Sequence, residues 1–380
     1  MGQGLRSKGS AAVSNDAAVR QPIAVAMSGG VDSSTAAALL VEQGFGVFGV
    51  MMRLWATQYE QGVPLNRCCS EDAVDDARRV CYLLGIPFHL VNLEDQFKAQ
   101  VVDYFCDTYA RGRTPNPCPV CNRQIKFGAL WRVASELGAQ RLATGHYARI
   151  KRSNGHYQLL RGSDREKDQS YMLYSLSQDQ LARALFPLGD LAKSQVRSLA
   201  LAHRLPVAEK PESQDVCFIS DGDYRAFLAE QRPEAVRAGP ILDQEGNVLG
   251  QHSGLAFYTI GQRQGLGIAA PHPLYVVEMD MARSALVVGP KHAVYQSALL
   301  AEQVHYISGS PPIEPVRVTA KIRYRAAEAG ARLFPLAGDM ARVVFDQPQA
   351  AITPGQAVVF YQQEVVLGGG IIARAGSLEE

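Results

Sequence analysis

A glycine- and serine-rich turn between a strand and a helix constrains the fold of this chain more than any other sequence feature. The apolar run Gln21–Met27 predicts a short buried strand, and Ser34–Gln43 has the composition of a helix. Between them lies Ser-Gly-Gly-Val-Asp-Ser, residues 28–33, and no lysine follows the glycines as it does in Walker-type NTPase loops. Glycines let the backbone approach an anion closely, and amides at a helix start bind phosphate oxygens. The segment therefore predicts a phosphate-binding strand–loop–helix unit.

The first 220 residues alternate between strand-like and helix-like segments. Further strands are predicted at Phe45–Met52, Phe88–Leu93 and Arg141–Thr144. Helices are predicted at Ser70–Leu84, Glu94–Tyr109 and Gln124–Leu137. This alternation predicts right-handed βαβ units and a parallel, Rossmann-like sheet covered by helices on both faces.

The pattern changes after about Asp221, and from Gly239 the chain is rich in glycine and proline. The clearest strand is Val316–Arg325, whose even positions are apolar and whose odd positions carry four cations and no anion: Arg317, Lys321, Arg323 and Arg325. This alternation predicts a half-buried antiparallel strand with a basic outer face suited to phosphate contact. Similar runs at 341–345, 356–361 and 364–367 predict a small β-barrel or sandwich.

We therefore predict an α/β protein of several parts. A disordered leader at 1–20 precedes a catalytic α/β domain at 21–220, a small β-rich linking domain at 221–297 and a C-terminal β-barrel at 298–380. The leader lacks the apolar stretch of a secretory signal, and a transit peptide is the alternative interpretation of its few basic residues.

Composition excludes several classes of protein. There are 38 Lys and Arg against 37 Asp and Glu, so the chain is not basic throughout, although one domain can still carry a basic surface. No apolar run approaches the roughly 18–20 residues of a membrane span. Seven cysteines in 380 residues are too few for a disulfide-stapled secreted scaffold. We expect a cytoplasmic protein without membrane association, whose cysteines are free, catalytic or metal-bound.

Two cysteine-bearing segments carry the most chemical information. Cys118-Pro-Val-Cys121 lies in a loop that enters a helix, where a thiol has a lowered pKa, and Cys217 follows 96 positions after Cys121. Two separated thiols suit sulfur transfer, in which one carries a persulfide, the other attacks it and a disulfide is left. A metal or iron–sulfur site is the alternative; no second C-x-x-C or H-x-H pair is present, so further ligands would come from Cys68 and Cys69. The cysteines in helical segments are predicted core residues: Cys81 and Cys106.

These motifs resemble those of known enzymes. Ser-Gly-Gly-Val-Asp-Ser resembles the pyrophosphate-binding loop (PP-loop) of the ATP-pyrophosphatase superfamily, which transfers AMP to a carbonyl oxygen and releases pyrophosphate. From about Pro22 to Ala373 the chain resembles the tRNA-specific 2-thiouridylase family, through NPC-x-x-CN-x-x-IKF, ATGHYA, KDQSYML, ESQDVCFI and GLAFYTIGQRQGLGI. The resemblance implies ATP-dependent 2-thiolation of the wobble uridine of tRNA, with Mg²⁺ bound through the phosphates. It also implies a persulfide donor protein, fed by a cysteine desulfurase, as a partner.

The resemblance assigns roles to the residues that match the family's motifs. Cys121 matches the nucleophilic thiol and Cys217 the persulfide-bearing thiol, whereas Cys118 stands where some members have Asp, so the acid–base residue stays open. The nucleotide-binding matches are Ala26, Met27, Ser28, Gly29, Gly30, Val31, Asp32, Ser33, Met52 and Gly145. The target base is expected at Asn116, Pro117 and Cys118. The tRNA-contacting matches are His146, Lys167, Asp168, Gln169, Arg323, Tyr324 and Gln356.

Two other functions are compatible with a phosphate-binding loop alone. Another PP-loop adenylating ligase, such as an amidating enzyme, would need an ammonia source, and no glutaminase domain is evident. A non-catalytic RNA- or nucleotide-binding protein would not need both thiols. The complete set of motifs favours the 2-thiouridylase.

Overall fold

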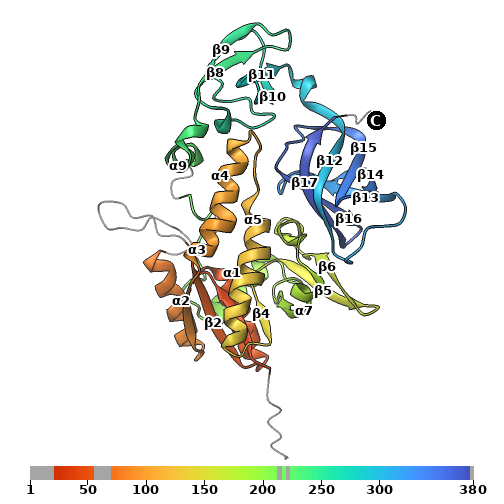
Figure 1. Ribbon diagram of the computed structural model, residues 1–380. Coiled ribbons are helices and arrows are strands. Elements are labelled where there is room, and N and C mark those ends of the chain that lie inside the picture. The colour runs from red at the N-terminus through yellow and green to blue at the C-terminus, as the bar shows by residue number, and fades with distance from the viewer. Residues whose placement is uncertain (1–20, 55–69, 212–215, 220–222, 377–380) are drawn as a thin grey trace, which may run out of the picture.

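A five-stranded parallel sheet forms the N-terminal part of the described protein (Figure 1). The computed structural model describes residues 21–54, 70–211, 216–219 and 223–376, so the predicted leader, Cys68 and Cys69 lie outside the described residues. The strand order is β3-β2-β1-β4-β7. The strands are β1 (Ile23–Met27), β2 (Val47–Arg53), β3 (Phe88–Asn92), β4 (Arg141–Ala143) and β7 (Ala184–Leu185). Every pairing in this sheet is parallel, which confirms the predicted Rossmann-like sheet.

Helices cover both faces of the sheet because strand side chains alternate in direction. On one face of the sheet, the side chains of Ile23, Val25 and Met27 pack into a core with a first group of helices. On the opposite face, Ala24 packs into a second core with a second group of helices. The first group comprises α1 (Val31–Glu42) and α2 (Glu71–Leu83), with α8 (Lys193–Ala202) beside α1. The second comprises α3 (Glu94–Phe97), η1 (Lys98–Val102) and α4 (Asp103–Ala110), then α5 (Pro117–Val120), η2 (Cys121–Leu130) and α6 (Trp131–Glu136).

The second long helical segment begins at Pro117 and not near Gln124 as predicted. Proline at the first helical position loses no hydrogen bond, because the first amides of a helix have no partner within it. The Asn116 side chain caps this start by accepting a hydrogen bond from the Cys118 amide at 3.3 Å. The two prolines around Cys118 therefore start the helix, and Cys118 and Cys121 lie in its first turns.

The C-terminal part is a β-barrel, as predicted. Its six strands run in the order β12-β15-β14-β13-β16-β17, and pairing of β12 with β17 closes the barrel. They are β12 (Tyr295–Tyr306), β13 (Val316–Lys321), β14 (Ala329–Leu336), β15 (Met340–Ala350), β16 (Ala357–Gln362) and β17 (Val365–Ala375). A hairpin from the N-terminal part, β5 (Ala148–Ser153) and β6 (His156–Arg161), joins this sheet where Leu160 pairs with Val365. The sequence analysis did not predict this hairpin.

A small four-stranded sheet lies between these two parts in sequence, at the top of Figure 1. Its order is β10-β11-β8-β9, and the helix α9 (Tyr224–Gln231) precedes it. The strands are β8 (Gly239–Leu242), β9 (Val248–His252), β10 (Tyr275–Asp280) and β11 (Ala285–Gly289). The predicted β-rich central part is confirmed.

The predicted strand 316–325 is too long, and two cations of its predicted basic face contact other parts of the protein. The strand β13 ends at Lys321, although its even positions are buried or half-buried as expected. Arg317 forms an ion pair with Asp346 on β15, with Nη2 2.6 Å from Oδ2. Arg323 is half-buried and donates from Nη2 to the carbonyls of residues 350 and 351, at 2.9 Å each. The anionic and carbonyl partners come from segments that are distant in sequence.

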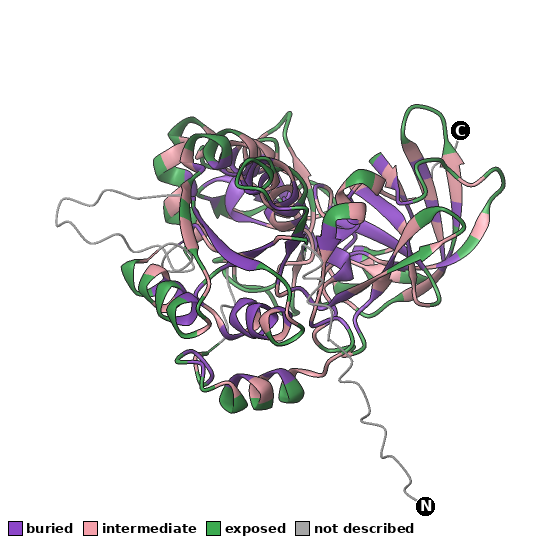
Figure 2. Cartoon of the chain, turned by 90° about the horizontal axis from the view of Figure 1, so that it is seen from below, coloured by how far each residue is buried: buried purple, intermediate pink, exposed green. Residues whose placement is uncertain are grey.

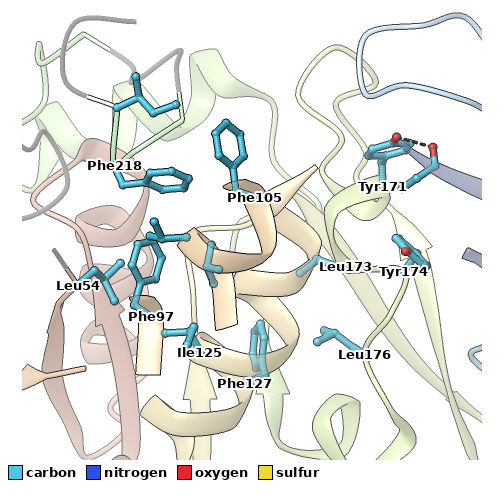
Figure 3. Close-up of a cluster of buried hydrophobic side chains, with 14 of the residues drawn as sticks. Leu54, Phe97, Phe105, Ile125, Phe127, Tyr171, Leu173, Tyr174, Leu176 and Phe218 are labelled. Atoms are coloured by element: carbon cyan, nitrogen blue, oxygen red, sulfur yellow. Dashed lines mark hydrogen bonds between the residues drawn. The ribbon is translucent and has the colours of Figure 1, made fainter. Parts of the chain in front are cut away.

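One buried core joins the N-terminal helices to the barrel. Tyr171 is fully buried, and its hydroxyl donates to the Ala357 carbonyl on β16 at 2.8 Å, the dashed line in Figure 3. Arg161 on β6 forms an ion pair with Glu328 and lies over the ring of Tyr361. Buried residues accordingly run from the sheet into the barrel in Figure 2. The barrel is therefore packed against the N-terminal α/β part through a shared core.

Candidate active site

A cavity of about 270 Å³ opens at the carboxyl ends of β1 and β2. Met27 ends β1, Ser28 follows it, and Met52 lies near the end of β2. In parallel sheets with helices on both faces, ligands bind at this edge. Ten of the residues singled out from the sequence line the cavity: Met27, Ser28, Met52, Pro117, Cys118, Cys121, His146, Gln169, Cys217 and Tyr324. The structure thus brings the loop, three thiols and a barrel residue to one place.

The loop between β1 and α1 has the conformation that its glycines require. Gly29 has φ +68°, and a Cβ there would lie 2.9 Å from the Ala73 Cα and closer still to the Ala73 carbonyl oxygen. Within the loop, the Ser28 amide donates to the Ser33 hydroxyl at 3.2 Å. Gly30 precedes α1 and offers no side-chain acceptor to the first-turn amides. These amides are therefore able to bind an anion.

The Asp32 carboxylate is held by two residues that the sequence analysis did not single out. Lys193 at the start of α8 donates to Asp32 Oδ1 at 2.7 Å and Oδ2 at 2.9 Å, and the Tyr147 hydroxyl donates to Oδ1 at 2.7 Å. Gly145 packs against the same turn, since a Cβ there would lie 2.7 Å from the Ser33 amide. Gly145 supports the loop and is not among the cavity-lining residues. No local pattern links Asp32 to a lysine 161 positions away.

The three thiols at the cavity differ from the two in helical cores. Cys118, Cys121 and Cys217 are partly exposed. Cys81 and Cys106 are buried as predicted, and burial raises the pKa of each thiol to about 11. A thiol with such a pKa is protonated at neutral pH, so of the five cysteines in the described residues the three at the cavity are the ones placed for chemistry.

Aromatic packing positions Cys217. The next residue, Phe218, is buried and its ring lies edge-on to Phe97 and Phe105, with ring centroids 5.6 and 5.2 Å apart (Figure 3). Phe97 and Phe218 also line the cavity. The segment that carries Cys217 is therefore anchored to the helices beside the C-x-x-C motif.

His146 lies buried at the cavity between aromatic rings. Its Nδ1 lies 2.7 Å from the Thr144 hydroxyl, and the rings of Phe127 and Phe186 are its neighbours. Burial, and then the positive charge of Lys126, lower the pKa of His146 well below its usual value. The imidazole is therefore neutral at pH 7.

Other predicted contact residues hold the protein's own backbone. Asp168 is buried and accepts from the amides of residues 162 and 170 and from the Ser170 hydroxyl. Gln169 accepts from the Tyr147 amide at 3.0 Å. Their contacts with tRNA, like those of Lys167, stay predictions.

The loop before the C-x-x-C motif is tied to both other parts of the protein. Gln356 Nε2 donates to the carbonyls of Thr114 and Pro115, at 3.1 Å each. The Thr114 amide donates to the Pro354 carbonyl at 2.9 Å, and its hydroxyl bonds to that of Thr259 at 3.1 Å. The barrel and the central part together fix the entry into the helix that carries Cys118 and Cys121.

Several cavity residues were missed because they are apolar or carry no motif meaning of their own. Asn122, whose amide donates to the Met172 carbonyl at 2.9 Å, and Lys126 lie inside the quoted cysteine motif. The remaining missed residues are Leu54, Phe97, Val101, Met172, Val216 and Phe218.

Within the described residues no cluster of three His, Cys, Asp or Glu is placed to hold a metal ion. Likewise, none of the described helices has the length and apolarity to cross a membrane.

A parallel sheet with a Ser-Gly-Gly-Val-Asp-Ser loop after its central strand defines the class of PP-loop, ATP-using enzymes. Three family models match the chain: "tRNA methyl transferase HUP domain" at 21–221, "tRNA methyl transferase PRC-barrel domain" at 225–290 and "Aminomethyltransferase beta-barrel domain" at 296–372. These matches cover all three parts of the fold described above.

Curated relatives match over nearly their whole length. The tRNA-specific 2-thiouridylase MnmA of Moorella thermoacetica is 53% identical over 350 residues, which cover 92% of this chain and 98% of the relative. The proteins of the same name from Roseiflexus castenholzii and Magnetococcus marinus are each 51% identical, covering 93% of this chain and 99% of the relative. The chain belongs to the tRNA-specific 2-thiouridylase MnmA family. The amidating ligase and the non-catalytic binding protein considered from the sequence are therefore not supported.

Proposed function

We propose that this family member thiolates the wobble uridine of tRNA with Cys217 as the persulfide carrier and Cys121 as the attacking thiol. The observation that carries this proposal is that one cavity is lined by the loop residue Ser28 and by both thiols. Nucleotide activation and sulfur delivery are then possible at a single uridine. The choice of Cys121 over Cys118 rests on the family resemblance.

The proposed reaction has three steps. The C2 oxygen of uridine attacks the α-phosphorus of ATP, and pyrophosphate leaves. The terminal sulfur of the Cys217 persulfide attacks C2, the N3 proton is lost, and AMP leaves with the former C2 oxygen. The Cys121 thiolate then attacks Cys217 Sγ and breaks the S–S bond, whose electrons pass to the transferred sulfur. N3 regains a proton from solvent as this sulfur becomes the thiocarbonyl. A Cys121–Cys217 disulfide remains, which an external thiol reduces before a persulfide donor reloads Cys217.

The PP-loop supports the ATP part of the proposal. The first-turn amides of α1 and the Ser28 hydroxyl would hold phosphate oxygens, and Met27 and Met52 offer apolar contact for the adenosine. Mg²⁺ would come with the nucleotide, bound to its phosphates, where it offsets their charge. The protein's own task is to bind the phosphates and to orient the α-phosphorus toward the uridine.

Cysteine variants test the assignment. Cys121→Ser and Cys217→Ser should each abolish formation of 2-thiouridine, measured by mass spectrometry of tRNA nucleosides after reaction with ATP and a persulfide donor. Cys106→Ser is the matched control, because this thiol is buried away from the cavity, and it should keep activity. Pyrophosphate release in the first turnover should persist in both inactive variants, since adenylation precedes sulfur transfer. Loss of thiolation in Cys118→Ser with retention in Cys121→Ser would show that the nucleophile is Cys118.

A further inference from the structure

The cavity has an unbalanced charge. The described side chains that line it include no Asp, Glu or Arg, and His146 is neutral. Lys126 is the one cationic side chain among these described lining residues. In a partly enclosed, largely apolar cavity a charge acts with less screening than in water. Among the described lining side chains, Lys126 is therefore the source of positive charge that acts on the thiols.

The helix geometry brings Lys126 onto the face that carries Cys121. The segment η2 is a π-helix that begins at Cys121, so Lys126, five positions on, lies one hydrogen-bonded turn further along. In a regular α-helix residues five apart would lie about 140° apart around the axis, and Lys126 would point away from Cys121. Both side chains line the same cavity, as this geometry requires.

We propose that Lys126 activates Cys121 electrostatically, by holding its thiol as a thiolate ready to attack Cys217 Sγ. The inference rests on the proposed function, in which Cys121 is the attacking thiol. The proton passes to solvent and the ammonium group keeps its charge, so no further reactant is needed. A neighbouring lysine is a known cause of a lowered cysteine pKa.

The surroundings of Cys121 contain no carboxylate that would cancel this effect among the described residues lining the cavity. The lowered pKa of His146 supports the inference, because burial and then the Lys126 charge cause it. The charged groups on η2 and on the helices packed against it are ion-paired or exposed: Lys98 pairs with Asp103 and Glu94 with Arg53. The exposed ones are Asp95, Arg123, Arg132 and Glu136. Among the described residues, the other titratable side chains that line the cavity are Cys118, His146, Cys217 and Tyr324.

The test is the pH dependence of iodoacetamide alkylation at Cys121 in the full-length protein, followed by tandem mass spectrometry that separates Cys118 from Cys121. In the wild type the midpoint should lie below the ordinary cysteine pKa of about 8.5. Lys126→Met should raise the midpoint by about one pH unit, which slows alkylation at pH 7 about tenfold. Lys126→Arg should restore it. Lys151→Met, at an exposed position on β5, is the matched control and should leave it unchanged.

Two results would overturn the inference. One is a wild-type midpoint at or above the ordinary value, which needs no variant and therefore does not depend on the folding of Lys126→Met. The other is a midpoint that does not move in Lys126→Met, or that Lys126→Arg fails to restore. The thiolation assay on Cys121→Ser separates the two proposals: activity in that variant refutes the proposed nucleophile, whereas its inactivity with an unmoved midpoint refutes only the role of Lys126.

Discussion

Replacing Gly29 by alanine should show that this glycine is required by the fold of the PP-loop. A non-glycine residue in the left-handed conformation at φ +68° costs about 1–2 kcal/mol. The added Cβ would also overlap the backbone of Ala73 on α2, and such overpacking costs about 1–3 kcal/mol. Together these terms predict a loss of about 2–5 kcal/mol in local stability. Since α2 or the loop must shift, ATP affinity should fall as well.

Gly30→Ala is the matched control at the adjacent position. Gly30 has φ −106°, and its Cβ would meet only the Ser28 hydroxyl oxygen, at 3.4 Å. Its expected cost is at most about 1 kcal/mol, because alanine is a poorer helix cap than glycine. Thermal unfolding followed by circular dichroism and ATP titration by calorimetry compare the two variants. Equal unfolding midpoints for Gly29→Ala and Gly30→Ala would refute the argument from backbone strain and overlap.

Three further perturbations follow from the contacts described above. His146→Asn should make the free energy of unfolding depend less on pH below about 6.5. In the wild type the buried imidazole resists protonation while the unfolded one gains a proton near pH 6.5, so the protein loses up to about 1.4 kcal/mol of stability per pH unit below that pH. Urea unfolding at several pH values should show a smaller loss in the variant. Arg323→Ala should lower the unfolding midpoint more than Arg325→Ala, because Arg323 bonds to backbone carbonyls whereas the Arg325 side chain is exposed. If Arg323 also contacts a tRNA phosphate, its removal makes the slope of log affinity for tRNA against log salt shallower by about 1. Ending the chain before Ala298 should yield a product that aggregates and does not bind ATP, because Tyr171 and Arg161 lose their barrel partners. Size-exclusion chromatography and calorimetry measure the two effects. A monomeric, ATP-binding fragment would contradict the shared core.

Local patterns in the sequence predicted the parallel sheet, the PP-loop and the buried thiols. The strands, the helices and the loop between them each follow from neighbouring residues, so periodicity, the alternation of strands with helices, and glycine placement suffice to find them. The predicted helix began too late, near Gln124; the structure starts it at Pro117, since the first turn of a helix tolerates proline.

What escaped prediction depends on contacts between distant segments. The hairpin β5–β6 is completed by β17, where Leu160 meets Val365, and the Asp32 carboxylate is neutralised by Lys193. The basic face of β13 was expected to be free, because the pattern of one strand does not reveal that Arg317 pairs with Asp346 on another strand. Single-sequence periodicity contains no information about such pairs.

The bonds that tie Thr114 and Pro115 to Gln356, Pro354 and Thr259 also restrict how this enzyme can be recombined. A chimera that takes its barrel from a relative replaces two of these three partners while keeping the loop that they hold. The reactive helix would then start from a displaced anchor even if every cysteine were retained. Loop 114–116 and turn 353–356 should therefore be exchanged as one cassette, and substitutions in either are expected to be compensated in the other during divergence of the family.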